Sequence, residues 1–220
     1  MEIKVIKDVM EANNAIAENI KKKLWERKTI MINIIGSPGS GKTTFILETI
    51  KNLNIKSAVI EGDITSDIDA KKVAEVGVPV IQINTGGSCH LNANMIDAAL
   101  EEIPGDKMII FVENIGNIVC PANFDIGEDF KIALSSITEG DDKPYKYPAI
   151  FERARAVILN KIDLVPYVKF DKEFFYDGIE TLNPNAATFE VASISGEGIR
   201  VWTKWLKDLF IAKCETMKGN

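Results

Sequence analysis

Histidine and cysteine are scarce in this sequence, and their scarcity excludes several classes of protein. One histidine, His90, and three cysteines, Cys89, Cys120 and Cys214, occur in 220 residues. An odd number of widely separated cysteines does not suit a disulfide framework and indicates a reducing compartment. We therefore expect a cytoplasmic protein, and we note that the one histidine directly follows a cysteine.

Long hydrophobic runs and an excess of positive charge are also missing. No apolar stretch is long enough to span a bilayer, and the first seven residues, MEIKVIK, alternate charged and apolar side chains unlike a signal peptide. The net charge of −6 argues against a general nucleic-acid surface, which requires an excess of Lys and Arg. The sequence thus predicts a protein that binds neither membranes nor nucleic acids, and local features must hold any anionic ligand.

Apolar runs alternate with helical patterns along the chain. An amphipathic helix is expected over residues 2–28, and it should pack on the domain that follows. Strand-like runs lie at residues 30–35, 56–61, 78–84, 108–113, 132–138, 156–160 and 188–193, with helical patterns at 42–53, 66–76, 91–102, 171–182 and 198–213. The polar stretch from Thr138 to Pro148 is interpreted as a surface loop. This alternation predicts a single α/β domain over residues 1–220, doubly wound around a mainly parallel sheet of about seven strands with helices on both faces.

A glycine-rich motif follows the first predicted strand and opens a helix. Residues 36–43 read Gly-Ser-Pro-Gly-Ser-Gly-Lys-Thr and fit the pattern G-x-x-x-x-G-K-[ST]. The glycines let backbone N–H groups surround phosphates, and the helix N-terminus adds partial positive charge. We expect Lys42 to reach the β- and γ-phosphates and Thr43 to ligate Mg²⁺. The alternative is a plain glycine-rich turn. The predicted phosphate-binding residues are Gly36, Ser37, Pro38, Gly39, Ser40, Gly41, Lys42, Thr43 and Thr44.

A second motif, Asn160-Lys161-Ile162-Asp163, follows the strand predicted at residues 156–160. It fits the N-K-x-D pattern of guanine-nucleotide proteins, in which the carboxylate of Asp163 accepts from guanine N1–H and N2–H₂. The Lys161 stem can cover the base, and Asn160 can tie this loop to the phosphate loop. Alternatively, Asp163 caps a helix.

The loop after the last predicted strand, which contains Ser193, Ile194 and Ser195, can offer a backbone N–H to guanine O6. Many GTPases carry Lys where this chain has Ser195, but the backbone contact survives that change. Ser195 can equally cap the final helix.

Acidic residues end two other predicted strands. Asp63 closes Glu61-Gly62-Asp63, Asp67 follows, and Glu113 begins Glu-x-x-Gly, which ends at Gly116. A carboxylate at this edge typically holds Mg²⁺, so we expect Asp63 and Glu113 to join Thr43 as its ligands, and Gly116 to sense the γ-phosphate. The alternative is acidic turns in solvent. Because no catalytic Gln or Arg finger can be picked, intrinsic turnover should be slow.

Two further segments carry Cys89, His90 and Cys120 beyond the carboxyl ends of predicted strands, so they can share one edge of the sheet. One imidazole and two thiolates suit Zn²⁺ or Ni²⁺, but three ligands do not close a tetrahedral site, and a second chain or a water must complete it. Buried cysteines also occur simply as small hydrophobic residues, which is the alternative.

Taken together, the motifs resemble those of the hydrogenase nickel-incorporation GTPases, the HypB family. The segments that carry the resemblance are residues 36–43, 61–63, 86–91, 113–121 and 160–163, and it extends over roughly residues 10–212. The resemblance implies a SIMIBI-class P-loop fold, a homodimer favoured by GTP, and Ni²⁺ or Zn²⁺ at the subunit interface on Cys89, His90 and Cys120. It also implies assistance in inserting nickel into the large subunit of [NiFe] hydrogenase, alongside a small nickel chaperone.

The sequence departs from the family pattern in two respects. It has neither an N-terminal C-x-x-C-G-C motif nor a His-rich tract, so nickel storage is not expected. The related urease nickel GTPase carries Cys-Pro-His, whereas here Pro121 is followed by Ala122, which favours hydrogenase over urease maturation. Remaining alternatives are a urease-type or other metal-coupled regulatory GTPase, a signalling GTPase, a small-molecule kinase, and a metal-binding module with a decaying nucleotide site.

Overall fold

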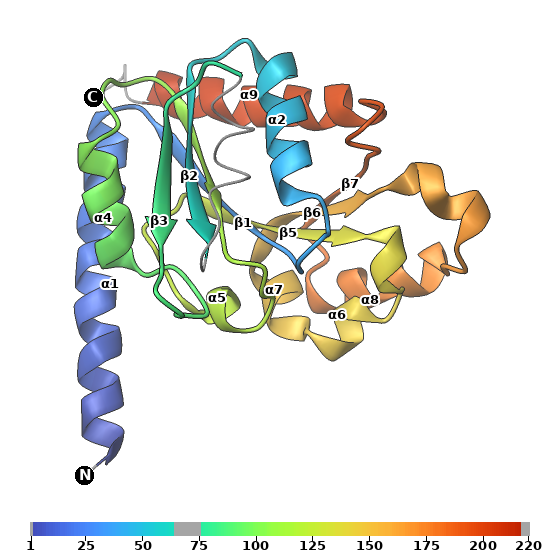
Figure 1. The fold of residues 1–220 in the computed structure, drawn as a ribbon, viewed down its shortest axis with the longest axis horizontal. Helices are drawn as coiled ribbons and strands as arrows, with labels where there is room; N and C mark the ends of the chain where they lie inside the picture. The colour runs from blue at the N-terminus through green and yellow to red at the C-terminus, as the bar shows by residue number, and fades with distance from the viewer. Residues whose placement is uncertain (1, 64–75, 217–220) are drawn as a thin grey trace.

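The computed structural model describes residues 2–63 and 76–216, and side chains from Met10 onward (Figure 1). Asp67 and nearly all of the helix expected over residues 66–76 lie outside these ranges. Seven parallel strands form one sheet in the order β3-β2-β4-β1-β5-β6-β7. Their bounds are β1 Ile30–Ile35, β2 Ser57–Asp63, β3 Val80–Asn84, β4 Ile109–Glu113, β5 Phe130–Ser136, β6 Ala154–Asn160 and β7 Ala187–Glu190. The predicted parallel sheet of about seven strands is confirmed.

Helices cover both faces of the sheet (Figure 1). Their bounds are α1 Glu2–Glu26, α2 Lys42–Leu53, α4 Ala93–Glu101, α5 Cys120–Asn123, α6 Lys143–Lys146, α7 Pro148–Arg153, α8 Lys172–Leu182 and α9 Ile199–Thr216, with 3₁₀ turns at Ile137–Glu139 and Ile162–Tyr167. Side chains alternate along β1: Ile32 and Ile34 pack with α2 and α9, Met31 packs with α1 and α4, and Ile35 packs with α7 and α8. Such alternation between two covered faces explains why the strands read as continuous apolar runs.

The stretch from Thr138 to Pro148 is not the surface loop that its polar composition suggests. β5 ends at Ser136, two residues before the predicted end, and a 3₁₀ turn begins there with a capping box between Ser136 and Glu139. Two short helices follow, each with a proline in its first turn, Pro144 in α6 and Pro148 in α7. Proline suits the first helical turn because the N–H it lacks has no partner there.

Because the strands are parallel, the carboxyl ends of all strands that precede the motifs lie at one edge of the sheet. The loops after β1, β3, β4, β6 and β7 therefore converge there, as expected for a ligand site in an open parallel sheet. No helix in the described part of the chain is long and apolar enough to cross a membrane.

Candidate nucleotide site and metal centre

The glycine-rich loop joins β1 to α2. Gly41 lies at the N-terminus of α2 with φ of 96°, and a Cβ added there would come within 2.5 Å of the Asn160 Nδ2 atom. Glycine is therefore required both by the backbone conformation and by the approach of Asn160. The Lys42 side chain is buried and folds back over the loop, where its Nζ donates to the carbonyls of Gly36 at 3.3 Å and Ser37 at 3.2 Å. This places the ammonium group inside the curve of the loop.

A cavity of about 350 Å³ opens beside this loop at the ends of β2 and β4. Its lining includes five residues predicted for phosphate and Mg²⁺ chemistry, namely Lys42, Thr43, Asp63, Glu113 and Gly116. Within the lining, the hydroxyl of Thr43 donates to Glu113 Oε1 at 3.0 Å. The structure thus brings these residues together around one space large enough for a phosphate chain.

Glu61 is a lining residue that the predicted Mg²⁺ set leaves out. It sits opposite Glu113 in the β2–β4 register, and both carboxylates are buried. Two carboxylates side by side with the hydroxyl of Thr43 form an oxygen donor set that suits a hard divalent cation such as Mg²⁺. The sequence offered one indication of this role for Glu61, namely its position at the same strand end as Asp63.

The side chain of Asn160 holds three loops together. Its Nδ2 donates to Ser40 O at 3.0 Å, and its Oδ1 accepts from the Ser193 N–H at 3.2 Å and the Ser193 hydroxyl at 2.9 Å. Lys161 has the left-handed φ of 61°, and its Nζ donates to Gly39 O at 2.6 Å. The predicted connection between Asn160 and the phosphate loop is confirmed, so the base-reading loops and the phosphate loop form one unit.

Two alternative interpretations of these loops are wrong. Asp163 is not a helix cap, because Lys161 occupies the N-cap position of the 3₁₀ turn. Asp163 is exposed. Ser195 does not cap the final helix, because α9 begins at Ile199 and the Ser195 hydroxyl donates to Ala192 O within its own turn. Ile194, in this loop, is 89% exposed.

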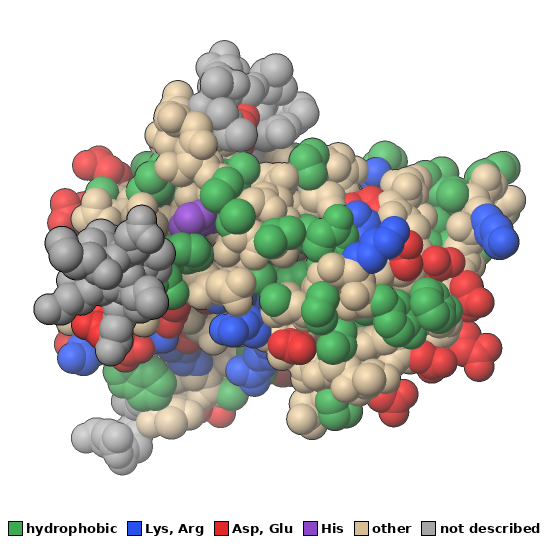
Figure 2. Space-filling model, turned by 90° about the horizontal axis from the view of Figure 1, so that it is seen from below, with side chains coloured by type: hydrophobic (Ala, Val, Ile, Leu, Met, Phe, Trp, Pro, Cys, Tyr) green, Lys and Arg blue, Asp and Glu red, His purple; other side chains and the backbone are tan. Residues whose placement is uncertain are grey.

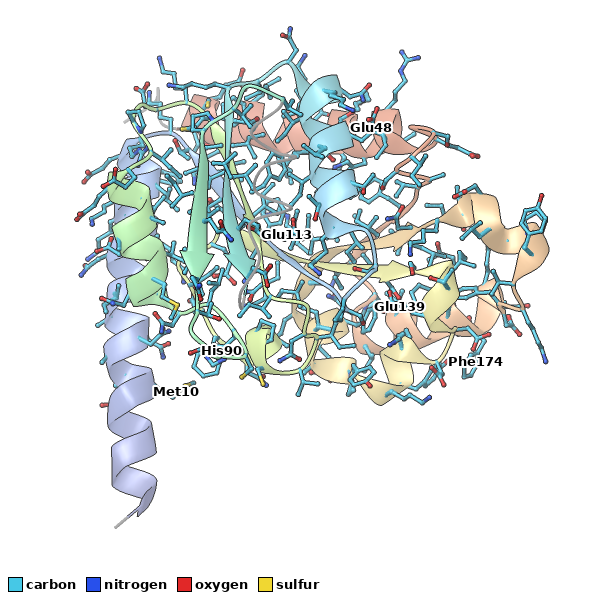
Figure 3. The ribbon with its side chains drawn as sticks, in the orientation of Figure 1. Met10, Glu48, His90, Glu113, Glu139 and Phe174 are labelled. Carbon is cyan, nitrogen blue, oxygen red and sulfur yellow. The ribbon has the colours of Figure 1, made fainter. Side chains whose placement is uncertain are left out.

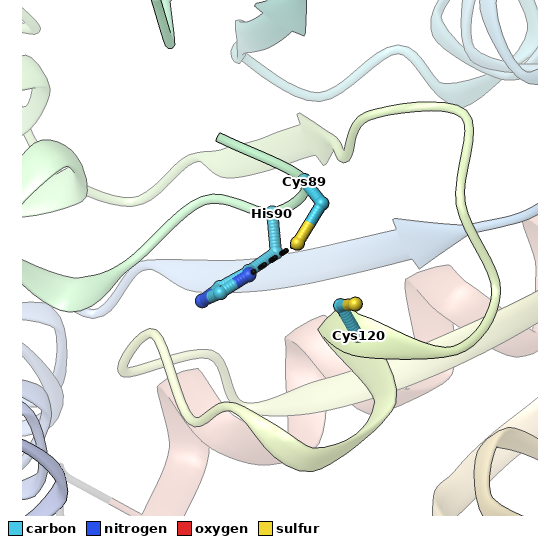
Figure 4. A group of neighbouring side chains, drawn as sticks. All are labelled: Cys89, His90 and Cys120. Carbon is cyan, nitrogen blue, oxygen red and sulfur yellow. Dashed lines mark hydrogen bonds between the residues drawn. The ribbon is translucent and has the colours of Figure 1, made fainter. Parts of the chain in front are cut away.

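The Cys and His side chains predicted to bind metal form one cluster (Figure 4). The candidate ligand atoms of Cys89, His90 and Cys120 all lie within 4.8 Å of one another, and the Cys89 Sγ is 3.4 Å from the His90 Nδ1. Cys120 is the first residue of α5, whereas the other two precede α4. Cys214 lies elsewhere, on α9, with its Sγ 3.9 Å from Lys28 O.

The surroundings shift the pKa values of Cys89 and His90. A hydrogen bond with the neighbouring Cys120 thiol raises the pKa of Cys89, and burial and the repulsion between two close thiolates add to the rise. Burial lowers the pKa of His90, which favours the neutral imidazole that binds metals. The His90 ring packs against the Phe124 ring, with 3.8 Å between centroids and 30° between the planes. Two thiolates and one imidazole suit Ni²⁺ or Zn²⁺ and leave one position of a tetrahedron for a further ligand.

The cluster is accessible at the surface. Figure 2 shows the histidine side chain, in purple, on the lower face of the molecule, with hydrophobic side chains nearby. Figure 3 shows His90 below the carboxyl ends of the strands, while Glu113 lies at the end of the sheet. The neighbouring Val119 is 54% exposed.

Hydrogen bonds and close packing connect the cluster to the nucleotide cavity. Asn117 donates from Nδ2 to Cys89 O at 3.1 Å and accepts from the Val119 N–H at 2.9 Å, so it joins the segments that carry the two cysteines. Its neighbour Gly116 lies against the phosphate loop, since a Cβ there would come within 2.8 Å of Pro38 Cγ. One packing contact, the peptide bond from Gly116 to Asn117 and one hydrogen bond therefore lead from the phosphate loop to the backbone of Cys89.

Comparison with known proteins agrees with this arrangement. The sequence profile described as "CobW/HypB/UreG, nucleotide-binding domain" matches residues 30–190. The hydrogenase maturation factor HypB of Escherichia coli K12 is 45% identical over 203 residues, which cover 91% of this chain and 70% of that protein. The chain belongs to the HypB hydrogenase maturation factors.

Solved HypB structures have the same fold. The crystal structure of HypB from Archaeoglobus fulgidus matches with a TM-score of 0.85 and 34% identity, covering 91% of this chain and 99% of that one. HypB from Helicobacter pylori, crystallised in complex with nickel, matches with a TM-score of 0.87 and 32% identity, covering 91% and 96%. The predicted family resemblance and P-loop fold are confirmed.

Proposed function

We propose that this HypB protein is a GTP-hydrolysing metallochaperone that carries nickel, or zinc, on Cys89, His90 and Cys120 and assists nickel insertion into [NiFe] hydrogenase. The observation that carries the proposal is the set of contacts from Pro38 through Gly116 and Asn117 to Cys89. If Gly116 senses the γ-phosphate, as we propose, a change of nucleotide there would move the metal ligands. The nickel complex of the related Helicobacter pylori protein supports nickel as the cargo.

The nucleotide half of the proposal assigns a role to each motif. Lys42 and the backbone of the phosphate loop hold the β- and γ-phosphates, and Asp163 selects guanine. The Thr43 hydroxyl and the carboxylates of Asp63 and Glu113 fit Mg²⁺ by donor type, and the ion would neutralise charge on the phosphates. Glu61, buried beside Glu113, belongs with this set. Slow intrinsic turnover follows, because none of these residues is an Arg finger or a Gln that positions water.

The metal half explains why a second copy of the chain is needed. Three ligands from one chain leave the site open, and a facing chain can supply the missing thiolate or imidazole. Exposed Val119 beside Cys120 and the apolar surroundings of His90 suit such a contact. We therefore propose a homodimer favoured by GTP and metal. A nickel chaperone would supply the ion, and the hydrogenase large-subunit precursor would be the client.

Metal affinity is expected to differ between the GDP state and a GTP-analogue state. A coupling of about 1–3 kcal/mol corresponds to a change of about 5–150-fold in the dissociation constant for Ni²⁺ or Zn²⁺. The measurement is competition against a metal-binding dye at matched protein concentration, with molecular mass recorded in both states. By reciprocity, metal should shift the nucleotide-dependent dimerisation by the same factor.

A pair of asparagine variants localises this coupling. Asn117→Ala removes the contact to Cys89 O and should bring the two metal affinities together. Asn52→Ala, which removes an exposed bond to Glu48 O on α2, should leave the difference intact. The proposed function would be contradicted if the natural protein had equal metal affinities in both nucleotide states and the same molecular mass in both.

A further inference from the structure

One side chain of helix α1, that of Asn13, contacts both of the regions that follow the metal ligands. Asn13 Oδ1 accepts a hydrogen bond from the Ala93 N–H at 3.0 Å, and Asn13 Nδ2 donates to Asp125 O at 2.7 Å. The two partners lie 32 positions apart in the chain. One amide therefore joins the start of α4 to the segment that follows α5.

Each partner of Asn13 lies close to a ligand. Ala93 is three residues after His90 and is the first residue of α4, whose early N–H groups need acceptors from outside the helix. Asp125 follows Phe124, whose ring packs against His90, and is five residues after Cys120. The position of His90 relative to Cys120 thus depends on two backbone points that one side chain holds together.

Neighbouring contacts fix α1 against the same segment. Lys21 forms an ion pair with Asp125 at 2.6 Å, and Gly127, with φ of 85°, packs so closely that a Cβ would lie 2.5 Å from Ile20 Cβ. Figure 3 shows Met10, one turn before Asn13, at the end of the domain that carries His90. Movement of α1 would consequently shift Asp125 and, through the adjacent Phe124, the imidazole of His90.

We propose that Asn13 is a positioning residue of the metal centre, which holds the Cys89-His90 segment and the Cys120 segment at the separation that metal binding requires. This inference rests on the proposed metal-binding function and extends it to α1, a helix that contributes no ligand. It also makes α1 a place where a bound partner can change metal affinity without touching the thiolates.

Two substitutions at Asn13 test the proposal. Asn13→Ala removes both hydrogen bonds and should weaken Ni²⁺ binding about tenfold, the lower end of the effect seen when a hydrogen-bonding partner behind metal ligands is lost. Asn13→Asp keeps an acceptor for the Ala93 N–H but cannot donate to Asp125 O, so it should weaken binding as well. The readouts are the Ni²⁺ dissociation constant by dye competition and the intensity of thiolate-to-nickel charge-transfer absorption.

A matched control separates positioning from general stability. Lys23→Ala breaks another contact between α1 and α4, the 2.6 Å ion pair with Asp97, at a distance of about 15 Å along α1 from Asn13. It should leave the nickel affinity and spectrum unchanged. If Asn13→Ala lowers only the unfolding temperature and binds Ni²⁺ like the natural protein, the positioning role is overturned. If Cys120→Ala also binds Ni²⁺ like the natural protein, the proposed metal function itself fails.

Discussion

Replacing Lys42 with alanine is expected to lower GTP turnover by about 10²–10³-fold, the loss typical of removing one preorganised group that stabilises transition-state charge. The Lys42 ammonium group lies within hydrogen-bonding distance of the Gly36 and Ser37 carbonyls, inside the phosphate loop. With GTP bound it would turn from these carbonyls to the phosphates, where negative charge moves as the bond to the γ-phosphate breaks. The measurement is phosphate release at saturating GTP.

The controls for this prediction use the same helix. Lys51→Ala removes a lysine of α2 whose ion pair with Glu48 is at the surface, and it should turn over GTP at the natural rate. Circular dichroism should show the same helix content for both variants, because Lys42 contributes little apolar packing. A Lys42→Ala protein that is folded and hydrolyses GTP at the natural rate would refute the role assigned to Lys42.

The sheet could be predicted because its strands are buried on both faces. Each of the seven apolar runs overlaps one observed strand, and the helix expected over residues 42–53 matches α2. The short helices α6 and α7 were missed because they carry no such pattern. α6 and α7 span only four and six residues and carry prolines in their first turns, so neither periodicity nor composition distinguishes them from a loop.

Sequence analysis could identify those site residues that belong to a short local motif. Lys42 and Cys120 stand in short segments that the sequence singles out, and the structure places Lys42 in the cavity lining and Cys120 in the Cys/His cluster. Asn13 acts through partners distant in sequence, 80 and 112 residues away. A residue of this kind becomes visible only when the fold brings its partners together, because an asparagine in an amphipathic helix has no distinguishing pattern.

Replacing Asp163 with asparagine is expected to exchange guanine for xanthine specificity. Loss of a charged, bidentate contact to guanine N1–H and N2–H₂ should weaken GTP binding by about 2–4 kcal/mol. Xanthine carries a carbonyl where guanine has the N2 amino group, so the amide of asparagine can donate to that oxygen and accept from N1–H. The dissociation constants of GTP and xanthosine triphosphate should therefore move in opposite directions.

The surrounding contacts make this a specific test of base reading. Asp163 is exposed, and the links between its loop and the phosphate loop run through Asn160 and Lys161. The substitution should thus leave phosphate binding intact. Asp177→Asn makes the same charge change at an exposed position of α8 and should alter neither constant. Unchanged GTP affinity in Asp163→Asn would remove Asp163 from the base site. Equal weakening of both nucleotides would show that Asp163 maintains the loop and does not read the base.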